Sequence, residues 1–386
     1  MKDQNISPTS TSTSPNNEDS RCLFLAFELS NSRWNLSFSP GNLIKRNTSI
    51  TAWDHEALLS EIRKAKDKFG LPHDAIIYSC YEAGRDGFAL HRFLKNNNVT
   101  NVVVDSSSIL VDRKAKHAKT DNLDVEALRM MLIRYHRGET KVWSTVQVPT
   151  VEQEDERNPS RELDGLKGER TRLTNRIGSL LILLGLRLKV GEKFLEELSK
   201  QVTAYGTPVP PNRKSELERA FLRWKVVCDQ ISILEEERER KHKEAASTAA
   251  RVAALLQTLK GVGPVTAEKL TAELFWREFR NRKEIAAFAG LVPVPYCSGD
   301  SERCQGISKA GRSDIRKTMV ELSWIWERYQ PRSKISIWFQ QCFGHGGKRF
   351  RKVGIVAVAR KLLIALWRYA MDGVVPEGAI MKKAPC

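Results

Sequence analysis

The chain has 386 residues, a formal net charge of +17 and a sequence pI of about 9.6. It contains no run of about 18 apolar residues, which argues against a membrane-spanning helix. A chain of this length is long enough to form two or three domains, each with its own core.

The excess positive charge is concentrated near the C-terminus, where residues 301–386 contain 17 Lys and Arg against six Asp and Glu, a balance of +11. A segment with this charge is suited to neutralising phosphates. Its aromatic side chains could stack on bases or, at helical spacing, fill a core; they are Trp324, Trp326, Tyr329, Trp338 and Phe339. We therefore expect a nucleic acid partner, with a solvated basic surface as the alternative.

The seven cysteines are scattered and no two form a CxxC pair. This pattern is typical of a reduced, cytosolic protein, and we expect no zinc site at Cys297 and Cys304 because no further ligands stand at zinc spacing. Residues 1–21 are rich in Ser, Thr, Asn and Pro without the apolar segment of a signal peptide, which predicts a disordered tail.

Residues 22–145 alternate between strand and helix signals. Strands are expected over 23–29, 34–38, 75–80 and 99–104, and helices over 54–69, 87–95 and 121–135. The turn at residues 30–32 predicts a hairpin between the first two strands. This order of elements indicates an α/β layer built on a mixed sheet.

Four carboxylates stand at the ends of these elements. Asp121 and Asp124 lie three residues apart where a helix should begin, so they share one face, while Glu28 and Glu82 each follow an apolar run. Such a cluster repels itself unless it is protonated or binds cations, and its oxygen ligands favour Mg²⁺ or Mn²⁺. That chemistry suggests phosphoryl transfer on nucleic acid. In the alternative interpretation, Asp121 and Asp124 only cap and charge the helix N-terminus, and Glu82 is a loop acid.

Residues 146–250 carry two heptad-like apolar seams separated by the breaker Tyr205–Pro211. This pattern predicts a helical hairpin or coiled coil, a type of element that more often spaces or oligomerises a protein than catalyses. Residues 251–370 are expected to be largely helical, and residues 371–386 form a tail.

Two glycine-containing turns interrupt the helical C-terminal region. In the first, Lys260 precedes Gly261-Val262-Gly263-Pro264. This turn could present N–H groups to a phosphate, as helix-hairpin-helix modules do, or could simply connect two helices.

The second turn is expected at residues 295–300 and contains Ser298. In this position Ser298 could act as a nucleophile, with Lys309 or Arg312 stabilising the developing charge, or it could be an ordinary turn former. Other candidate contacts to nucleic acid are Lys119 and Arg316.

In their order and spacing, these pieces resemble the DEDD transposases of a bacterial insertion-sequence family. The resemblance runs from about residue 22 to residue 370. It is carried by Tyr81-Glu82-Ala83-Gly84, Ala118-Lys119-Thr120-Asp121-Asn122-Leu123-Asp124, Gly261-Val262-Gly263-Pro264, and Ala289-Gly290-Leu291-Val292-Pro293 through Ser298-Gly299 to Lys309-Ala310-Gly311-Arg312.

The resemblance implies an RNase H-like (RuvC-like) α/β domain over residues 22–145, a helical coiled-coil linker over 146–250 and a mostly α C-terminal domain over 251–370 that carries a catalytic serine. Carried over by position, the metal-binding acidic tetrad falls on Glu28, Glu82, Asp121 and Asp124, and the nucleophile falls on Ser298. The chain departs from the family pattern at Glu28, where the first acid is usually Asp.

The implied activity is DNA recombination through a serine–DNA link, with Mg²⁺ or Mn²⁺ held by the acidic tetrad. The expected partners are donor and target DNA, a structured guide RNA and further copies of the chain, as a dimer or tetramer, in the bacterial cytoplasm at the nucleoid. Two alternatives stay open. One is a metal-dependent nuclease of the junction-resolvase type, in which water attacks and Ser298 is dispensable; the other is a non-catalytic nucleic-acid-binding protein.

Overall fold

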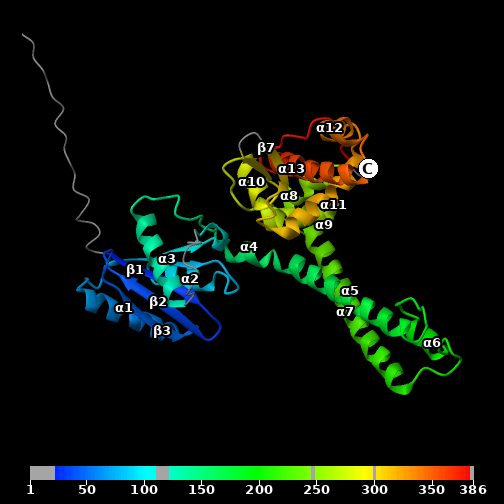
Figure 1. Cartoon of the computed structure of the whole chain (residues 1–386), viewed down its shortest axis with the longest axis horizontal. Coiled ribbons are helices and arrows are strands. Elements are labelled where there is room, and N and C mark those ends of the chain that lie inside the picture. The colour runs from blue at the N-terminus through cyan, green and yellow to red at the C-terminus, as the bar shows by residue number, and fades with distance from the viewer. Residues whose placement is uncertain (1–21, 110–120, 245–247, 299–300, 383–386) are drawn as a thin grey trace, which may run out of the picture. The chain divides into compact units, whose positions relative to one another are not determined.

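The computed structural model describes residues 22–109, 121–244, 248–298 and 301–382. The chain divides into two compact units, Met1–Val148 and Pro149–Cys386 (Figure 1). The expected disordered tail at residues 1–21 and the candidate Lys119 lie outside the described residues, as do the side chains of Asp121 and Ser298. No helix within the described ranges is long and apolar enough to cross a membrane.

The first unit is built on a five-stranded mixed sheet with the order β3-β2-β1-β4-β5. Strands β1, β2 and β3 pair antiparallel, whereas β4 pairs parallel with both β1 and β5, so the expected mixed sheet is confirmed. Its elements are β1 (Cys22–Leu29), β2 (Arg33–Ser39), β3 (Arg46–Thr51), α1 (His55–Phe69), β4 (Ile76–Glu82), α2 (Ala89–Asn96), β5 (Val99–Val104), the 3-10 turn η2 (Ser106–Ser108) and α3 (Asp121–His136).

Strand β1 is buried on both faces, and its alternating side chains divide the core of this unit in two. Leu23, Leu25 and Phe27 pack with residues of α1 and α2. The residues between them, Phe24 and Ala26, pack with residues of α3 on the opposite face. The unit therefore has three layers, with α1 and α2 covering one face of the sheet and α3 covering the other.

The second unit is mostly helical. Its elements are α4 (Val151–Asp155), α5 (Asn158–Ile182), α6 (Phe194–Ser199), α7 (Pro211–Glu244), α8 (Thr248–Gln257), α9 (Pro264–Leu270), the π-helical turn η3 (Thr271–Phe275), α10 (Arg282–Phe288), β6 (Pro293–Ser298), β7 (Ser301–Ile307), α11 (Ser313–Tyr329), α12 (Lys334–Phe343) and α13 (Lys348–Asp372).

Helices α5 and α7 form an antiparallel hairpin, as the two apolar seams predict. Leu163, near the start of α5, packs with Ile231 in the second half of α7, while Ile177 near the end of α5 packs with Leu217 near the start of α7. The Lys167–Glu235 ion pair, with its nitrogen and oxygen 2.8 Å apart, links the two helices further.

The remaining helices of the second unit pack around one core, which includes buried residues of α8, α9, α11 and α13. After α13 the chain folds back over the first glycine turn: the amide of Lys260 donates to the carbonyl of Ile380 at 3.0 Å, and the amide of Lys382 donates to the carbonyl of Thr258 at 2.6 Å. Part of the expected C-terminal tail is therefore paired with the connection between α8 and α9.

The expected turn at residues 295–300 is wrong in its extent, because residues 293–298 form a strand. Strand β6 pairs antiparallel with β7, in a register that places Pro295 opposite Cys304 and Ser298 opposite Ser301. The sequence analysis assigned residues 295–298 to a glycine-containing turn, and β6 also contains Pro293 and Pro295. A two-stranded ribbon has two edges, however, and an edge strand accepts proline because its outward N–H needs no partner.

Helices α12 and α13 pack closely at Gly354. A Cβ added there would lie 2.4 Å from the ring of Phe343 and 2.9 Å from the ring of Phe339, whereas a Cβ added at Gly178 in α5 would meet nothing within 4 Å. Gly354→Ala should therefore destabilise the protein by roughly 1–3 kcal/mol, despite the better helix propensity of alanine. Gly178→Ala should stabilise it by about 0.5–1 kcal/mol. Chemical denaturation of both variants tests this, and stabilisation by both would contradict the packing.

Glu327 in α11 contributes a stability that depends on pH. Burial raises its pKa above the ordinary value of about 4.5 despite hydrogen bonds from Ser336 and Gln340, and its Oε1 has no hydrogen-bond partner among the described atoms. The cost of burying the charge is therefore absent below about pH 4.5 and grows as the pH rises through the raised pKa.

Glu327→Gln should accordingly raise the melting temperature at pH 7 by a few degrees, equivalent to about 1 kcal/mol, and the gain should disappear near pH 4. Glu321→Gln, on the same helix but exposed, is the matched control and should change little at either pH. An equal gain for Glu327→Gln at both values would contradict the role of the charge.

Candidate functional site

Glu28 and Glu82 lie next to each other at the carboxyl edge of the central parallel pair. Strands β1 and β4 pair in register up to Phe27 opposite Tyr81, and each glutamate is the residue that follows. Both are partly buried. Because side chains alternate along a strand, both glutamates share the sheet face of Ala26 and Cys80, which is the face that α3 covers.

Helix α3 runs in the opposite direction to these strands, and this direction brings its N-terminus towards the glutamates. Its last residue, His136, lies over the ring of Tyr78 with the two centroids 4.1 Å apart. About two turns before His136, the carbonyl of Leu128 lies 3.8 Å from the sulfur of Cys80, which donates to it. Asp124 is one turn before Leu128, so it lies nearer still to the carboxyl edge of the strands.

Polar contacts hold α3 on the sheet. Arg129 is buried at 3% exposure and donates through Nε to the hydroxyl of Ser37 in β2 at 3.0 Å. One turn away, Glu126 accepts hydrogen bonds from Lys45 at 2.6 Å and from Asn47 at 2.5 Å. These contacts prevent α3 from sliding along its axis, and they therefore fix the position of Asp124 relative to the sheet.

The candidate ligand groups at this edge are carboxylates, whose oxygen atoms are of the type that hard divalent cations prefer. Burial, and then the charge of Glu82, raises the pKa of the Cys80 thiol, so this cysteine stays protonated and is no thiolate ligand. Among the side chains that the structure describes, no three His, Cys, Asp or Glu form a group able to hold a metal. Asp121, the fourth candidate, begins α3, but its side chain is outside that description.

In the second unit, Ser298 ends β6 at the tip of the β6–β7 hairpin. The base of this hairpin is held by main-chain hydrogen bonds from the segment after it to the segment before it. The amide of Ser308 donates to the Val292 carbonyl at 2.8 Å, and the amide of Lys309 donates to the Gly290 carbonyl at 3.2 Å. These bonds continue the pairing beyond the ends of the two strands.

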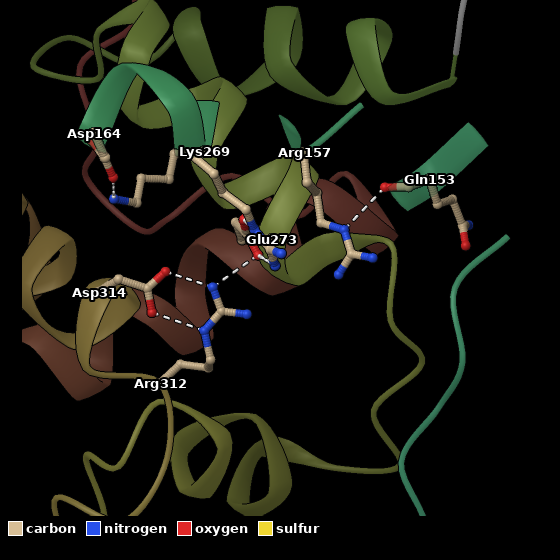
Figure 2. Close-up of polar contacts among 8 residues, drawn as sticks. Gln153, Arg157, Asp164, Lys269, Glu273, Arg312 and Asp314 are labelled. Atoms are coloured by element: carbon tan, nitrogen blue, oxygen red, sulfur yellow. Dashed lines mark hydrogen bonds and ion pairs between the residues drawn. The ribbon is translucent and has the colours of Figure 1, made fainter. Parts of the chain in front are cut away.

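Lys309 and Arg312, expected to act beside Ser298, and Arg316, expected to contact nucleic acid, lie in different environments. Lys309 is exposed and has a positive φ of 54°. Arg316 donates through one nitrogen to the carbonyls of Ala289 and Lys309, each at 3.2 Å, which holds the hairpin base. Arg312 forms ion pairs with Glu273 and Asp314, at 2.8 and 2.6 Å (Figure 2). Of the three, Lys309 is therefore the one whose side chain is turned to solvent.

The first glycine turn, with Gly261 and Gly263, connects α8 to α9 and packs against α11. Gly261 has a φ of 94°, and a Cβ there would lie 3.3 Å from Cβ of Tyr329. Gly263 caps the N-terminus of α9, and Lys260 beside the turn is exposed. This geometry is compatible with a turn that binds phosphate through its backbone N–H groups, and equally with a simple connection between two helices.

The C-terminal aromatic side chains divide between the core and the surface. Trp326 and Phe339 are fully buried, whereas Trp324 is 43% and Tyr329 is 41% exposed. The exposed pair lies on α11, and Tyr329 adjoins the first glycine turn. Burial therefore removes Trp326 and Phe339 from the candidates for base stacking.

Sequence analysis missed the carboxylate of Glu273, which is 2% exposed. It pairs with Arg161 of α5, 112 residues away in sequence, as well as with Arg312. One signal was available, because Glu273 is the one charged residue in the run Leu270–Trp276. Neither of its partners could be inferred from spacing.

Comparisons with known proteins find similarity to transposases over most of the chain. Residues 253–336 match the family described as Transposase IS116/IS110/IS902 family. The y4rJ protein of Sinorhizobium fredii, which is named as a transposase, is 39% identical over 383 residues, covering 94% of this chain and 96% of that protein.

Two further relatives match over shorter stretches. The transposase for insertion sequence element IS1328 of Yersinia enterocolitica is 27% identical, over 56% of this chain and 62% of that protein. The transposase for insertion sequence element IS1111A of Coxiella burnetii is 29% identical, over 58% and 60%. With one relative this similar from end to end, the chain belongs to the IS116/IS110/IS902 family of transposases.

Proposed function

We propose that this transposase cuts and rejoins DNA through a covalent link between Ser298 and a DNA phosphate. The observation that carries the proposal is the end-to-end similarity to a transposase, together with a family match that includes the β6–β7 hairpin and the Lys309–Arg312 segment. A serine at the tip of a ribbon, followed by an exposed cation, suits attack on an anionic phosphodiester.

In the proposed reaction, Oγ of Ser298 attacks the phosphorus and a new Oγ–P bond forms. The bond from phosphorus to the 3′ oxygen breaks, the serine proton is lost and the leaving oxygen gains a proton, so a 3′-hydroxyl is released. Attack by such a hydroxyl on another strand's phosphoserine restores a phosphodiester and the serine. Because the energy of the phosphodiester is conserved in the serine–phosphate link, the exchange requires no nucleoside triphosphate.

The proposal also includes an RNase H-like acidic site in the first unit. The mixed sheet of this unit, with three antiparallel strands followed by two parallel ones, has the α/β architecture that the resemblance implies. Glu28 and Glu82 lie side by side, and the direction of α3 places Asp124 on their side of the sheet. With Asp121, these residues would hold Mg²⁺ or Mn²⁺, which polarises a phosphate when bound.

Guidance by an element-encoded RNA and assembly as a dimer or tetramer complete the proposal, and both rest on the resemblance. The net charge of +17 and the α5–α7 hairpin are compatible with them. Recombination with and without RNA transcribed from the DNA that flanks the gene tests the first, and the mass of the protein in solution tests the second.

The chemical step is tested with purified protein, Mg²⁺, flanking RNA and labelled donor and target duplexes. The wild type should form a protease-sensitive protein–DNA adduct on denaturing gels, and Ser298→Ala should abolish it with folding and DNA binding unchanged. Ser301→Ala is the matched control, because Ser301 pairs with Ser298 across the same hairpin, and it should retain the adduct. Strand cutting that survives Ser298→Ala but is lost in Asp121→Ala would establish a hydrolytic nuclease instead.

Lys309 is expected to bind DNA through a phosphate. Lys309→Asn removes the charge while keeping a residue that tolerates the positive φ. It should weaken binding to all sequences alike and reduce the slope of log affinity against log salt by about 1. Lys317→Asn, at an exposed position of α11, is the comparison and should have a smaller effect. An unchanged slope for Lys309→Asn would show that the side chain does not contact phosphate.

A further inference from the structure

A buried carboxylate joins three segments of the second unit that are remote in sequence. Glu273 lies in η3 with a side chain 2% exposed. Its Oε1 accepts from Nε of Arg161 at 2.6 Å, and its Oε2 accepts from Arg161 at 2.9 Å and from Arg312 at 2.8 Å. The two arginines come from α5 and from the residue before α11.

Arg312 extends the chain of charges by one further pair. It donates through Nε and through a terminal nitrogen to the two carboxylate oxygens of Asp314, at 2.8 and 2.6 Å, in the two-point geometry that fixes the plane of a guanidinium. Figure 2 shows Arg312 between Glu273 and Asp314. The guanidinium is therefore held on two sides and cannot turn towards another partner without breaking both pairs.

The charges in this network stabilise one another. Burial by itself raises the pKa of Glu273, but the hydrogen bond from Arg161 and the charges of both arginines outweigh it, and the net result is a lowered pKa. The hydrogen bond to Asp314, followed by the charge of Glu273, raises the pKa of Arg312. The network is therefore fully ionised at neutral pH.

Arg312 also belongs to the base of the β6–β7 hairpin. Its amide donates to the Phe288 carbonyl at 2.8 Å, and Gly311 beside it approaches the same carbonyl so closely that a Cβ would lie 2.4 Å from the oxygen. The preceding amides of Ser308 and Lys309 pair with Val292 and Gly290. A shift of Arg312 would consequently move the segment that follows β7 and closes the base of the hairpin.

We propose that Glu273 is a positioning residue that fixes the β6–β7 hairpin, and with it Ser298, relative to the α5–α7 hairpin. The proposal rests on the proposed function of Ser298 for its catalytic consequence. Through Arg161 and Arg312, one carboxylate sets the distance between α5 and the hairpin base. Losing it leaves two arginines that repel each other where one anion had held both.

A purely stabilising role is the competing explanation. Buried ion pairs often contribute little net stability compared with apolar packing, whereas they do impose one geometry. A positioning role and a stabilising role therefore differ in what a charge-neutral replacement changes. The first alters the reaction rate of fully folded protein, and the second alters only the melting temperature.

The test compares Glu273→Gln and Glu273→Asp with Asp164→Asn. Asp164 pairs with Lys269 (Figure 2), so it also connects α5 to the helices around Glu273, but it does not touch Arg312. Well below the melting temperature and at saturating duplex DNA, Glu273→Gln should slow single-turnover adduct formation about 10- to 100-fold. The Kd for DNA should stay within about twofold, Glu273→Asp should be intermediate, and Asp164→Asn should react like the wild type.

A second measurement does not depend on activity. Hydrogen exchange at the amides of Ser308, Lys309 and Arg312 reports whether the hairpin base stays closed. Exchange there should accelerate in Glu273→Gln and stay unchanged in Asp164→Asn. If the wild type forms no adduct, the proposed function fails while the exchange data still decide the inference. Unchanged exchange and rate in Glu273→Gln, with only a lower melting temperature, would overturn it.

Discussion

The carboxylate of Glu273 is the constraint on which the arrangement of the helical unit depends. It is almost fully buried, and a buried anion must be paired or it becomes protonated. Its partners are Arg161 of the α5–α7 hairpin and Arg312 of the hairpin base. Because the same carboxylate pairs with both arginines, the α5–α7 hairpin and the β6–β7 hairpin cannot be placed independently of each other.

In the first unit, the corresponding constraint is the direction of α3. The parallel pairing of β1 and β4 brings Glu28 and Glu82 to one edge of the sheet, but two carboxylates alone do not make a metal site. The antiparallel course of α3, fixed by the contacts of His136, Arg129 and Leu128, adds Asp124 to the same side. Each unit therefore carries one part of the proposed chemistry, the carboxylates in the first and Ser298 in the second.

Much of the first unit was predictable because its signals are local. The apolar run Leu23–Leu29 and the short turn after it predict the β1–β2 hairpin. The helical periodicity of residues 54–69 predicts α1, which Asp54 caps. The two glutamates were predictable as strand-end carboxylates on the same grounds, whereas their adjacency depends on the parallel pairing of β1 with β4. The two seams of α5 and α7 likewise predicted a helical hairpin.

Features that depend on tertiary contacts were not predictable. Residues 295–298 were assigned to a glycine-containing turn, but they belong to β6, a strand whose free edge accepts Pro293 and Pro295. Trp324 and Trp326 are two residues apart, and only the packing decides that the first is exposed and the second buried. The partners of Glu273 lie 112 and 39 residues away, and no local pattern connects them.

The most direct measurement is the identity of the residue that carries DNA during the reaction. The wild-type protein would be trapped on a labelled duplex, digested with protease and nuclease, and analysed by mass spectrometry for a peptide with a residual nucleotide. The account predicts a phosphodiester on Ser298. DNA cleavage that leaves no nucleotide on any peptide, or a nucleotide on a different residue, would contradict it.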